Sequence, residues 1–503
     1  GDVGGTKNKL MDKSDADQLM QYMIDFKWVP GGRYLWYGGR KARFYNNCYL
    51  LKAEEDTREE WADLWKRAGS CLMTGGGIGI DVSQFRPKGR TLSKTGGVSS
   101  GPIPFLYATN EIGRNVMQGG SRRSAMYGSM NWRHEDAAEF LTMKNWSEEV
   151  KARKAEDFNA HAPLDMMNVS LNYDDAWLQD MSNDVFMTNV KQAMMTGEPG
   201  FSFNFGSKQN ETLRNACCEI VSEDDSDVCN LSSVNLSRIE SLDEFKDVVR
   251  LVSKFLVCGL IRAELPYQKI EEVRQQNSRL GLGLMGMHEW LLKRDSRYEV
   301  TDELKSWLKV YRDESKKAAD EHCDRLYLNR PKGYRAIAPT GTISIIAGST
   351  SGIEPVYSVA MKRRYLTDGT RWKHEFAIDA TAQTLIDQGI SPGKIESATD
   401  LAADPERRIK FQHDVQAYVD QAISSTINLP QYGTELNNED LIPQYAGWIQ
   451  KYAKGLRGLT VYPDGSRGGQ PITSVPYEEA IKKKGIVFED NSEEQCLSGV
   501  CGI

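Results

Sequence analysis

The repeated change between helix-like and strand-like hydrophobic spacing is the feature of this chain that most restricts its fold. Apolar residues recur three and four positions apart in segments that predict amphipathic helices, at 10–28, 56–72, 242–263 and 302–327. Runs with the composition of strands lie between them, at 75–82, Met167–Leu171, Arg335–Ala338, Ile343–Ala347 and Leu459–Tyr462. This alternation predicts an α/β fold with a largely parallel sheet.

Length and composition narrow the class of protein. A chain of 503 residues is long enough for about two to four domains, or for one large α/β barrel with additions. The net charge of −7 argues against a broad nucleic-acid-binding surface, and no apolar run is long enough for a membrane span or a signal peptide. Nine cysteines are too few for a disulfide scaffold, and the odd number indicates reduced thiols and a cytoplasmic location.

The C-terminal end differs in composition from the rest of the chain. From Asp464 onward glycine, serine, proline and charged residues dominate, so we expect a folded unit over 1–463 and a linker with a flexible tail over 464–503. Cys496 and Cys501 lie in that tail. A thiol pair on a mobile segment can carry reducing equivalents, although two incidental surface thiols are an equally good interpretation of the spacing alone.

The segment Asn215-Ala216-Cys217-Cys218-Glu219 combines three chemically useful groups. On an extended segment alternate residues share a face, which predicts that Asn215, Cys217 and Glu219 converge and that Cys218 points away. An amide can bind a hydroxyl, a thiol can release a proton or a hydrogen atom, and a carboxylate can act as a general base. Structural cysteines in a strand are the commoner explanation of such a pattern.

Zinc binding is a competing explanation for Cys217, Cys218 and Cys229. No Cys-x-x-Cys pair occurs in the chain, and none of the six histidines lies near these cysteines in the sequence. Structural zinc sites use such pairs. We therefore expect no metal site.

Further motifs follow one another in a defined order. They are Asn47-Cys48, the glycine run 75–79, Phe85-Arg86-Pro87, 96–102, 118–120, 197–200, 215–219, 229–231, 280–283, 338–344 and 461–467. In this order they resemble the catalytic subunit of ribonucleotide reductases, from about Pro30 to the tail cysteines. The resemblance implies a ten-stranded α/β barrel built from two five-stranded parallel halves, with a flexible C-terminal tail.

The resemblance implies roles for the segment around Cys217. Cys217 becomes a thiyl radical that abstracts the 3′ hydrogen of the ribose. Glu219 takes the proton of the 3′-hydroxyl group, and Asn215 hydrogen-bonds the ribose hydroxyls. The chain departs from the family at Cys218, where a small residue without a thiol is usual.

The resemblance also implies roles for four further cysteines. Cys48 and Cys229 supply two reducing equivalents and become a disulfide as the 2′-hydroxyl leaves as water. Cys496 and Cys501 then reduce that disulfide by thiol–disulfide exchange, and thioredoxin or a similar dithiol reduces the tail.

The segment 339–344 is rich in hydroxyls and backbone donors. A helix beginning there would make it a phosphate site, and an ordinary strand–helix turn explains its composition equally well. The resemblance assigns it to the substrate phosphates. The substrate-binding residues that it implies are Asn47, Gly97, Pro339, Thr340, Gly341, Thr342 and Ser344.

Deoxynucleotide or ATP effectors are expected to bind elsewhere on the chain. Residues 118–128 resemble the loop that relays effector identity to the base pocket. The candidate effector-binding residues are Asp56, Arg86, Gln118 and Arg122, with Glu55 as an alternative to Asp56.

The pair Val461-Tyr462 indicates the source of the radical. Reductases that import the radical from a ferritin-like subunit carry two adjacent tyrosines here, whereas this chain has a valine before Tyr462. The resemblance is therefore to the adenosylcobalamin-dependent class II, with a class I-like subunit as the alternative. The glycyl-radical class is disfavoured because the tail has no Arg-Val-x-Gly-Tyr segment. A non-catalytic nucleotide-binding regulator would not need this set of thiols.

The expected substrates are ribonucleoside di- or triphosphates, and the sequence does not separate the two. Only 26 residues lie between Cys48 and Gly75. That leaves little room for the large insertion of the monomeric reductases, so we expect a homodimer. No nucleic-acid or membrane partner is expected.

Overall fold

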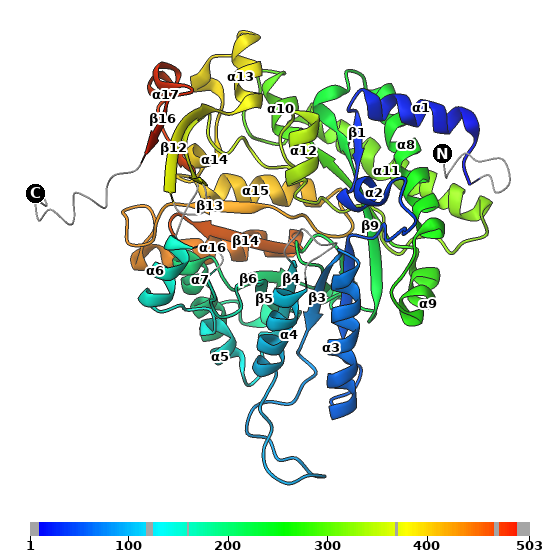
Figure 1. Cartoon of the computed structure of the whole chain (residues 1–503), viewed down its shortest axis with the longest axis vertical. Helices are drawn as coiled ribbons and strands as arrows, with labels where there is room; N and C mark the ends of the chain where they lie inside the picture. Colours follow the sequence, from blue (N-terminus) through cyan, green and yellow to red (C-terminus); the bar gives the residue numbers. More distant parts are fainter. Residues whose placement is uncertain (1–9, 117–123, 158–159, 368–370, 467–471, 490–503) are drawn as a thin grey trace, which may run out of the picture.

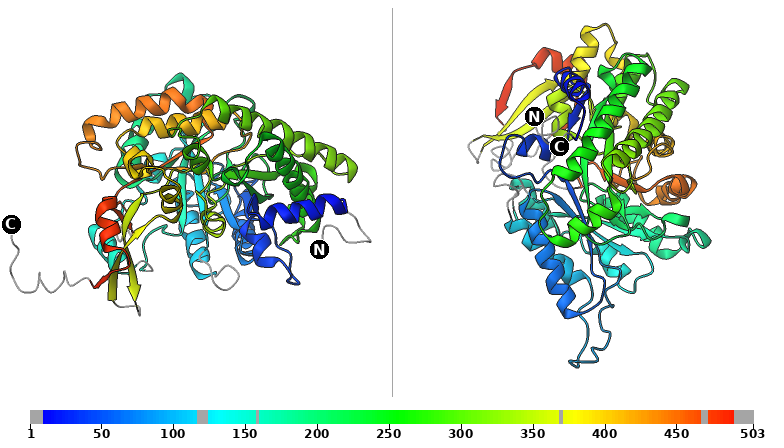
Figure 2. Two further views of the ribbon diagram at one scale, coloured as in Figure 1. Left: turned by 90° about the horizontal axis from the view of Figure 1, so that it is seen from above. Right: turned by 90° about the vertical axis from the view of Figure 1, so that its right-hand side faces the viewer.

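The computed structural model of the chain describes residues 10–116, 124–157, 160–367, 371–466 and 472–489 (Figure 1). Strands lie at the centre of the molecule, and helices are arranged around them (Figure 2). Within the described ranges, no helix has both the length and the apolar character that crossing a membrane requires.

Ten strands form the central sheet. In pairing order they are β1 (Trp28–Pro30), β9 (Asp227–Asn235), β2 (Cys48–Lys52), β3 (Gly77–Asp81), β4 (Met126–Asn131), β5 (Met167–Tyr173), β6 (Gly200–Phe203), β14 (Gly458–Pro463) and β13 (Thr426–Leu429), with β10 (Leu280–Met285) paired to β9. Strands β2 to β6 pair in parallel, as do β9 with β10 and β13 with β14. The pairs β2–β9 and β6–β14 are antiparallel.

Isolated bridges extend the sheet beyond β10. Leu282 pairs in parallel with Arg335, and Ile337 pairs in parallel with Ile423, shortly before β13 begins. The pairing therefore continues from β10 to the segment that leads into β13, and the strands enclose a barrel. The prediction of an α/β barrel is confirmed, while the predicted strand Arg335–Ala338 contributes bridges rather than a regular strand.

Helices cover the outside of the strands. They are α1 (Lys13–Ile24), α2 (Gly32–Tyr37), α3 (Arg58–Met73), α4 (Ile103–Asn115), α5 (Ala137–Thr142), α6 (Glu148–Glu156), α7 (Asp184–Thr196), α8 (Leu242–Arg262), α9 (Gln268–Asn277), α10 (Met287–Leu292), α11 (Asp302–Arg325), α12 (Gly341–Ala347), α13 (Ala380–Asp387), α14 (Ala398–Leu401), α15 (Pro405–Gln416), α16 (Ile442–Tyr452) and α17 (Tyr477–Lys483). The four helices predicted from apolar spacing are confirmed as α1, α3, α8 and α11.

Helix α8 illustrates how local sequence sets these elements. Ser241 precedes the helix, and its hydroxyl accepts the backbone N–H of Glu244 at 3.2 Å, which caps the first turn. Phe245, Val249 and Val252 recur on one face and are fully buried. This face lies in the hydrophobic core, and α8 packs along α11.

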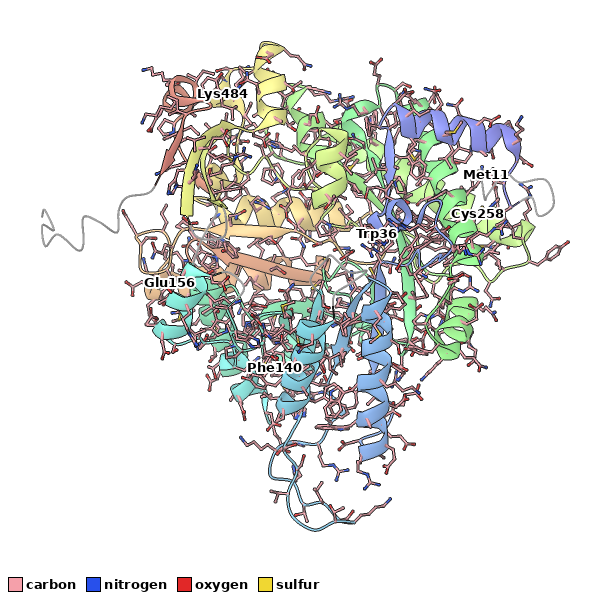
Figure 3. All side chains as sticks on the ribbon, viewed as in Figure 1. Met11, Trp36, Phe140, Glu156, Cys258 and Lys484 are labelled. Carbon is pink, nitrogen blue, oxygen red and sulfur yellow. The ribbon has the colours of Figure 1, made fainter. Side chains whose placement is uncertain are left out.

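Two large hydrophobic clusters connect the helices to the barrel. One lies around β3 to β6 and β14 and includes Phe140 of α5 (Figure 3). The other lies between β10, α8 and α11 and includes Met11 and Cys258 (Figure 3). Each cluster packs on the outer face of one part of the barrel, so side chains on the inner face remain available for the site.

The predicted strand Ile343–Ala347 is wrong, because these residues belong to α12. Ile343 and Ala347 are buried four positions apart, whereas Ile345 and Ile346 are 80% and 50% exposed. The run of β-branched residues suggested a strand. Burial of the side that carries Ile343 and Ala347 outweighs that weak preference.

A second sheet contains part of the expected linker. Its strands pair in the order β15 (Ile472–Ser474), β11 (Ala360–Thr367), β12 (Arg371–Ile378) and β16 (Val487–Glu489). It lies at the upper left of Figure 1, with α17 beside β12. Residues 472–489 therefore pair with an internal hairpin instead of forming a free linker, while the domain boundary after residue 463 stays a prediction.

We expect Leu256→Ala in α8 to lower the free energy of unfolding by about 2–5 kcal/mol, because a fully buried side chain leaves a cavity. Leu242→Ala removes the same atoms from a side chain that is 37% exposed, and we expect a loss below about 1 kcal/mol. Denaturant unfolding followed by circular dichroism measures both. Equal losses would contradict the assignment of the buried face.

Candidate active site

The segment that carries Cys217 is a tight turn between two short strands. Strands β7 (Leu213–Arg214) and β8 (Val221–Ser222) pair antiparallel, and between them the N–H of Cys218 donates to the carbonyl of Asn215 at 2.9 Å. Cys218 adopts a left-handed backbone conformation with φ +69°. The expectation of an extended segment with alternating faces is therefore wrong, because the chain reverses direction within these residues.

The side chains of the turn nevertheless differ in how far they are buried. Asn215 and Glu219 are buried, Cys217 is exposed and Cys218 is half-buried. Burial raises the pKa of the Cys218 thiol to about 12, and the neighbouring Glu219 carboxyl acts in the same direction. Cys217 is thus the more accessible of the two adjacent thiols.

Two further thiols lie next to each other on neighbouring strands of the barrel. Cys48 at the start of β2 is the register partner of Cys229 in β9, and both are buried free cysteines. Burial raises the pKa of both thiols, and the nearby groups Glu219, Cys229 and Cys217 raise that of Cys48 further. The structure thus brings Cys48, Cys229, Cys217 and Glu219 together, with both buried thiols protonated at neutral pH.

Asn215 is held in a fixed orientation. Its side-chain Nδ2 donates to the Cys48 sulfur at 3.1 Å, and its Oδ1 accepts the N–H of Ile220 at 3.0 Å. The amide therefore joins the turn to β2 and aligns the turn with the thiol pair.

Glu219 carries an unsatisfied acceptor. Its Oε2 is buried and has no hydrogen-bond partner among the described residues. Burial raises the pKa of this carboxyl to about 7, and a hydrogen bond from Asn215 opposes that shift. A buried acceptor without a partner indicates a site for a polar ligand group, and this carboxyl can gain or lose a proton near neutral pH.

The predicted phosphate segment begins close to this group. Buried residues on the inside of the barrel form one apolar cluster: Cys48, Leu50, Leu213, Ile220, Cys229, Leu231, Ala336 and Ala338. Ala338 directly precedes Pro339, and Thr340 adopts a left-handed conformation before α12 begins at Gly341. The Thr340 hydroxyl accepts the N–H of Gly352 at 2.8 Å, and the Ser344 hydroxyl lies 2.7 Å from that of Ser351. Gly341 and Thr342 are exposed.

Asn47 also lies beside the thiol pair. Its N–H donates to the carbonyl of Cys229 at 3.2 Å, and its carbonyl accepts the N–H of Gly77 at 2.8 Å. Its side-chain Oδ1 is buried and lacks a partner among the residues that the structure describes. Asn47 therefore offers a second unsatisfied acceptor near Cys48.

Other candidate residues are not part of this group. Gly97 lies on an exposed loop between β3 and α4 that projects from the bottom of the molecule (Figure 1). Asp56 and Arg86 form an ion pair with each other, with 2.5 Å between Oδ2 and Nε. Gln118, Arg122, Cys496 and Cys501 lie outside the described residues.

A cavity next to Cys217 contains residues that the sequence did not single out. It is lined by Tyr127, Ser170, Ser202, Ser424 and Thr460 together with Arg214, Cys217 and Cys218. Arg214 is buried, and its side chain donates to the Asn204 side chain at 2.7 Å and to the carbonyl of Arg457 at 3.1 Å. These residues come from six separate segments of the chain, so no local spacing could have identified them.

The fold of this chain is similar to that of a solved structure. The structure of the α subunit of a class Id ribonucleotide reductase from Actinobacillus ureae superposes with a TM-score of 0.69. The match covers 90% of this chain and 91% of that one, at 18% sequence identity. At this identity the likeness shows a shared fold.

Sequence relatives cover most of the chain. A protein named vitamin B12-dependent ribonucleoside-diphosphate reductase from Thermoplasma acidophilum is 26% identical over 551 aligned positions, which cover 94% of this chain and 68% of the relative. A protein of the same name from Mycobacterium tuberculosis is also 26% identical, with 91% of this chain and 73% of the relative covered.

A family model matches the barrel itself. The model for the ribonucleotide reductase barrel domain matches residues 46–195, 181–307 and 330–462. These ranges contain the turn, the thiol pair and the segment before α12. Since they make up most of the sequence, this chain belongs to the family of the ribonucleotide reductase barrel domain.

Proposed function

We propose that this chain reduces ribonucleotides to 2′-deoxyribonucleotides by thiyl-radical chemistry. The observation that carries the proposal is the buried Glu219 carboxyl beside a pair of protonated thiols. Its Oε2 has no hydrogen-bond partner in the part of the chain that the structure describes. A ribose hydroxyl is a suitable donor to that oxygen. Family membership makes the substrate a nucleotide, and di- and triphosphates both remain candidates.

Three residues of the turn, Asn215, Cys217 and Glu219, take part in the proposed reaction. The Cys217 thiyl radical takes the hydrogen atom from C3′ of the ribose and becomes a thiol. Glu219 accepts the 3′-hydroxyl proton, while Asn215 hydrogen-bonds the ribose hydroxyls. The radical at C3′ then allows the 2′-hydroxyl to take a proton from one thiol of the Cys48 and Cys229 pair and to leave as water.

The two buried thiols supply the electrons. Cys48 and Cys229 give up two hydrogen atoms in total, form a disulfide and leave C2′ reduced. Glu219 returns its proton to the 3′ oxygen, and return of a hydrogen atom from Cys217 to C3′ completes the deoxyribose and restores the radical. The raised pKa of both thiols favours this role, because a thiol can donate a hydrogen atom and a thiolate cannot.

The substrate phosphates are proposed to bind at the beginning of α12. The N–H groups of Gly341, Thr342 and Ile343 belong to a first helical turn, where no intrahelical acceptor exists for them. The hydroxyls of Thr340, Thr342 and Ser344 add donors, and Pro339 fixes the entry of the chain. Asn47 is proposed to contact the nucleotide through its unsatisfied Oδ1. Gly97 would reach the substrate only if its loop moved.

Adenosylcobalamin is the proposed radical source, as the names of both sequence relatives suggest. When bound, it supplies the oxidising equivalent that removes the hydrogen atom of the Cys217 thiol. The cavity beside Cys217 is lined by Tyr127, Ser170, Ser202, Ser424 and Thr460, each of which carries a hydroxyl group. Hydroxyl groups suit hydrogen bonding to the polar adenosyl part, so these residues would hold it.

The proposed reaction also needs re-reduction of the thiol pair and regulation by an effector. Cys496 and Cys501 would reduce the Cys48–Cys229 disulfide and be reduced by thioredoxin or a similar dithiol. The chain is proposed to act as a homodimer with a deoxynucleotide or ATP effector site. Asp56 and Arg86 already pair with each other, so an effector that binds them has to replace that ion pair. Gln118 and Arg122 are proposed to complete the effector site.

The function is tested by incubating the polypeptide with ribonucleotides and a dithiol, with and without adenosylcobalamin. We expect deoxynucleotides only with the cobalamin, together with cobalt(II) and an organic radical in paramagnetic resonance. Inertness with cobalamin and turnover with a ferritin-like metal subunit would favour the class I alternative.

We expect Cys217→Ser to abolish turnover and also the exchange reactions that need only hydrogen abstraction. Cys218→Ser removes the same atom one residue away and should retain much of the activity, since this half-buried thiol is the less accessible one. Steady-state assays of the matched pair measure the difference. The opposite result would assign the radical to Cys218.

The raised pKa of Glu219 makes both activity and stability depend on pH. We expect kcat to increase as pH rises through about 7, because the carboxylate is the base, and Glu219→Gln to lose most activity at every pH. Glu240→Gln, on the surface, is the control.

The stability of the folded state should change in the opposite direction. Folding favours the protonated carboxyl, so its contribution is complete below pH 4.5 and is lost as pH rises through about 7. Relative to Glu219→Gln, the unfolding free energy of the unmodified chain should fall by about 3 kcal/mol over that range. A pH-independent difference would show that Glu219 is not buried as described.

A further inference from the structure

A second cavity lies at the end of the barrel opposite Cys48. Strands β2 to β6 run parallel, and Cys48 begins β2. The cavity is formed by Phe203 at the end of β6 and residues 205–208 after it, by Gln416 and Val419, and by 454–457, which precede β14. β6 and β14 lie side by side (Figure 1). The cavity volume is about 370 Å³, within the range of small-ligand sites.

The lining of this cavity is rich in positive charge. Lys208, Lys454 and Arg457 line it, together with the aromatic side chain of Phe205. Lys454 is exposed, and the Lys208 ammonium donates to the backbone carbonyl of Asp420 at 3.0 Å. Within the described ranges neither lysine forms a salt bridge with a carboxylate. The cavity therefore presents two cations whose charge is not neutralised by direct pairing.

The nearby carboxylates are largely committed to other partners. The Asp420 carboxylate accepts the N–H groups of Tyr334 and Arg335 and pairs with the Arg335 guanidinium at 3.1 Å. Glu211 pairs with Arg457 at 2.8 Å. One carboxylate thus pairs with Arg457, whereas Lys208 contacts only a backbone carbonyl and Lys454 forms no salt bridge within the described ranges.

Arg457 retains a free hydrogen-bond donor. Only 7% of this residue is exposed, and its Nη1 has no partner among the described residues. Burial lowers the pKa of Lys208, and the charge of Arg457 lowers it further. Burial together with Arg457 likewise lowers the pKa of Arg214 to about 10. An anion placed here would relieve the repulsion among these cations.

We propose that this cavity binds the polyphosphate group of a small ligand, at a site separate from the segment 339–344. Lys208, Lys454 and Arg457 contact the phosphate oxygens through charge-assisted hydrogen bonds. Phe205 offers an aromatic ring next to these cations, on which a nucleobase can stack. A nucleoside triphosphate and an inorganic polyphosphate share the first feature, and only the nucleotide uses the second.

The site is connected to the turn that bears Cys217. Arg214 donates to the carbonyl of Glu211 at 2.6 Å and to that of Arg457 at 3.1 Å, and Asn215 follows it directly. A phosphate bound to Arg457 competes with Glu211 for the same guanidinium. Occupancy of the cavity therefore acts on the base of the turn from the side opposite the thiol pair.

Hydrogen–deuterium exchange of the whole chain, titrated with tripolyphosphate or with ATP, tests the proposal. We expect both ligands to slow exchange in peptides covering 203–214 and 453–460. Lys454→Gln should weaken this effect about threefold, and Lys208→Gln with Lys454→Gln at least about tenfold, because each removes a cation that contacts phosphate. The matched control is Lys246→Gln with Lys309→Gln, two exposed lysines on α8 and α11, and it should leave the titration unchanged.

Phe205→Leu distinguishes the two sources of phosphate. Weaker binding of ATP with unchanged binding of tripolyphosphate would identify a nucleotide, and unchanged binding of both would identify the polyphosphate group alone as the ligand. Absence of protection in the two peptides, or equal protection in the double lysine variant and its control, would overturn the proposal. The readout does not use turnover, so it is independent of the reductase reaction.

Discussion

The close passage of the Cys217-bearing turn across β3 is the constraint on which the rest of the site depends. A Cβ atom on Gly79 would lie 1.6 Å from the carbonyl oxygen of Arg214, and one on Gly77 would lie 3.0 Å from the Cβ of Ala216. Between them, Ile78 points the other way into the hydrophobic core. The absence of side chains at these two positions leaves room for the turn. Gly77 and Gly79 therefore shape the interior of the barrel, while Gly75 and Gly76 precede β3.

Burial of this turn sets the protonation of the groups around it. Cys48 and Cys229 stay protonated because the barrel interior is apolar, and Glu219 shifts toward neutral pH for the same reason. Asn215 links the turn to β2 through the Cys48 sulfur. The same packing that excludes water thus keeps two thiols as hydrogen donors and leaves one carboxyl able to exchange a proton.

Sequence reasoning predicted the elements whose signals are local. Apolar spacing identified α3, α8 and α11, and the ordered motifs identified Cys48, Asn215, Glu219 and Cys229, which the structure brings together. It failed where tertiary packing decides: Ile343–Ala347 became a helix, and 472–489 paired with a distant hairpin. It could not find Arg214 or the second cavity, whose residues 205–208 and 454–457 lie far apart in the sequence and come together beside the antiparallel pair β6 and β14. Spacing along the chain carries no information about such contacts.

The adjacent thiols Cys217 and Cys218 differ for a reason that strand alternation did not predict. Strand alternation was expected to point them in opposite directions, yet they lie in a turn and both line the same cavity. Their difference comes instead from the left-handed backbone of Cys218, whose side chain is half-buried with a pKa raised to about 12. Because the turn leaves Cys217 exposed, accessibility favours the proposal that Cys217, rather than Cys218, abstracts the hydrogen atom. The second thiol stands close enough to the same cavity that its replacement is the sharpest test of that distinction.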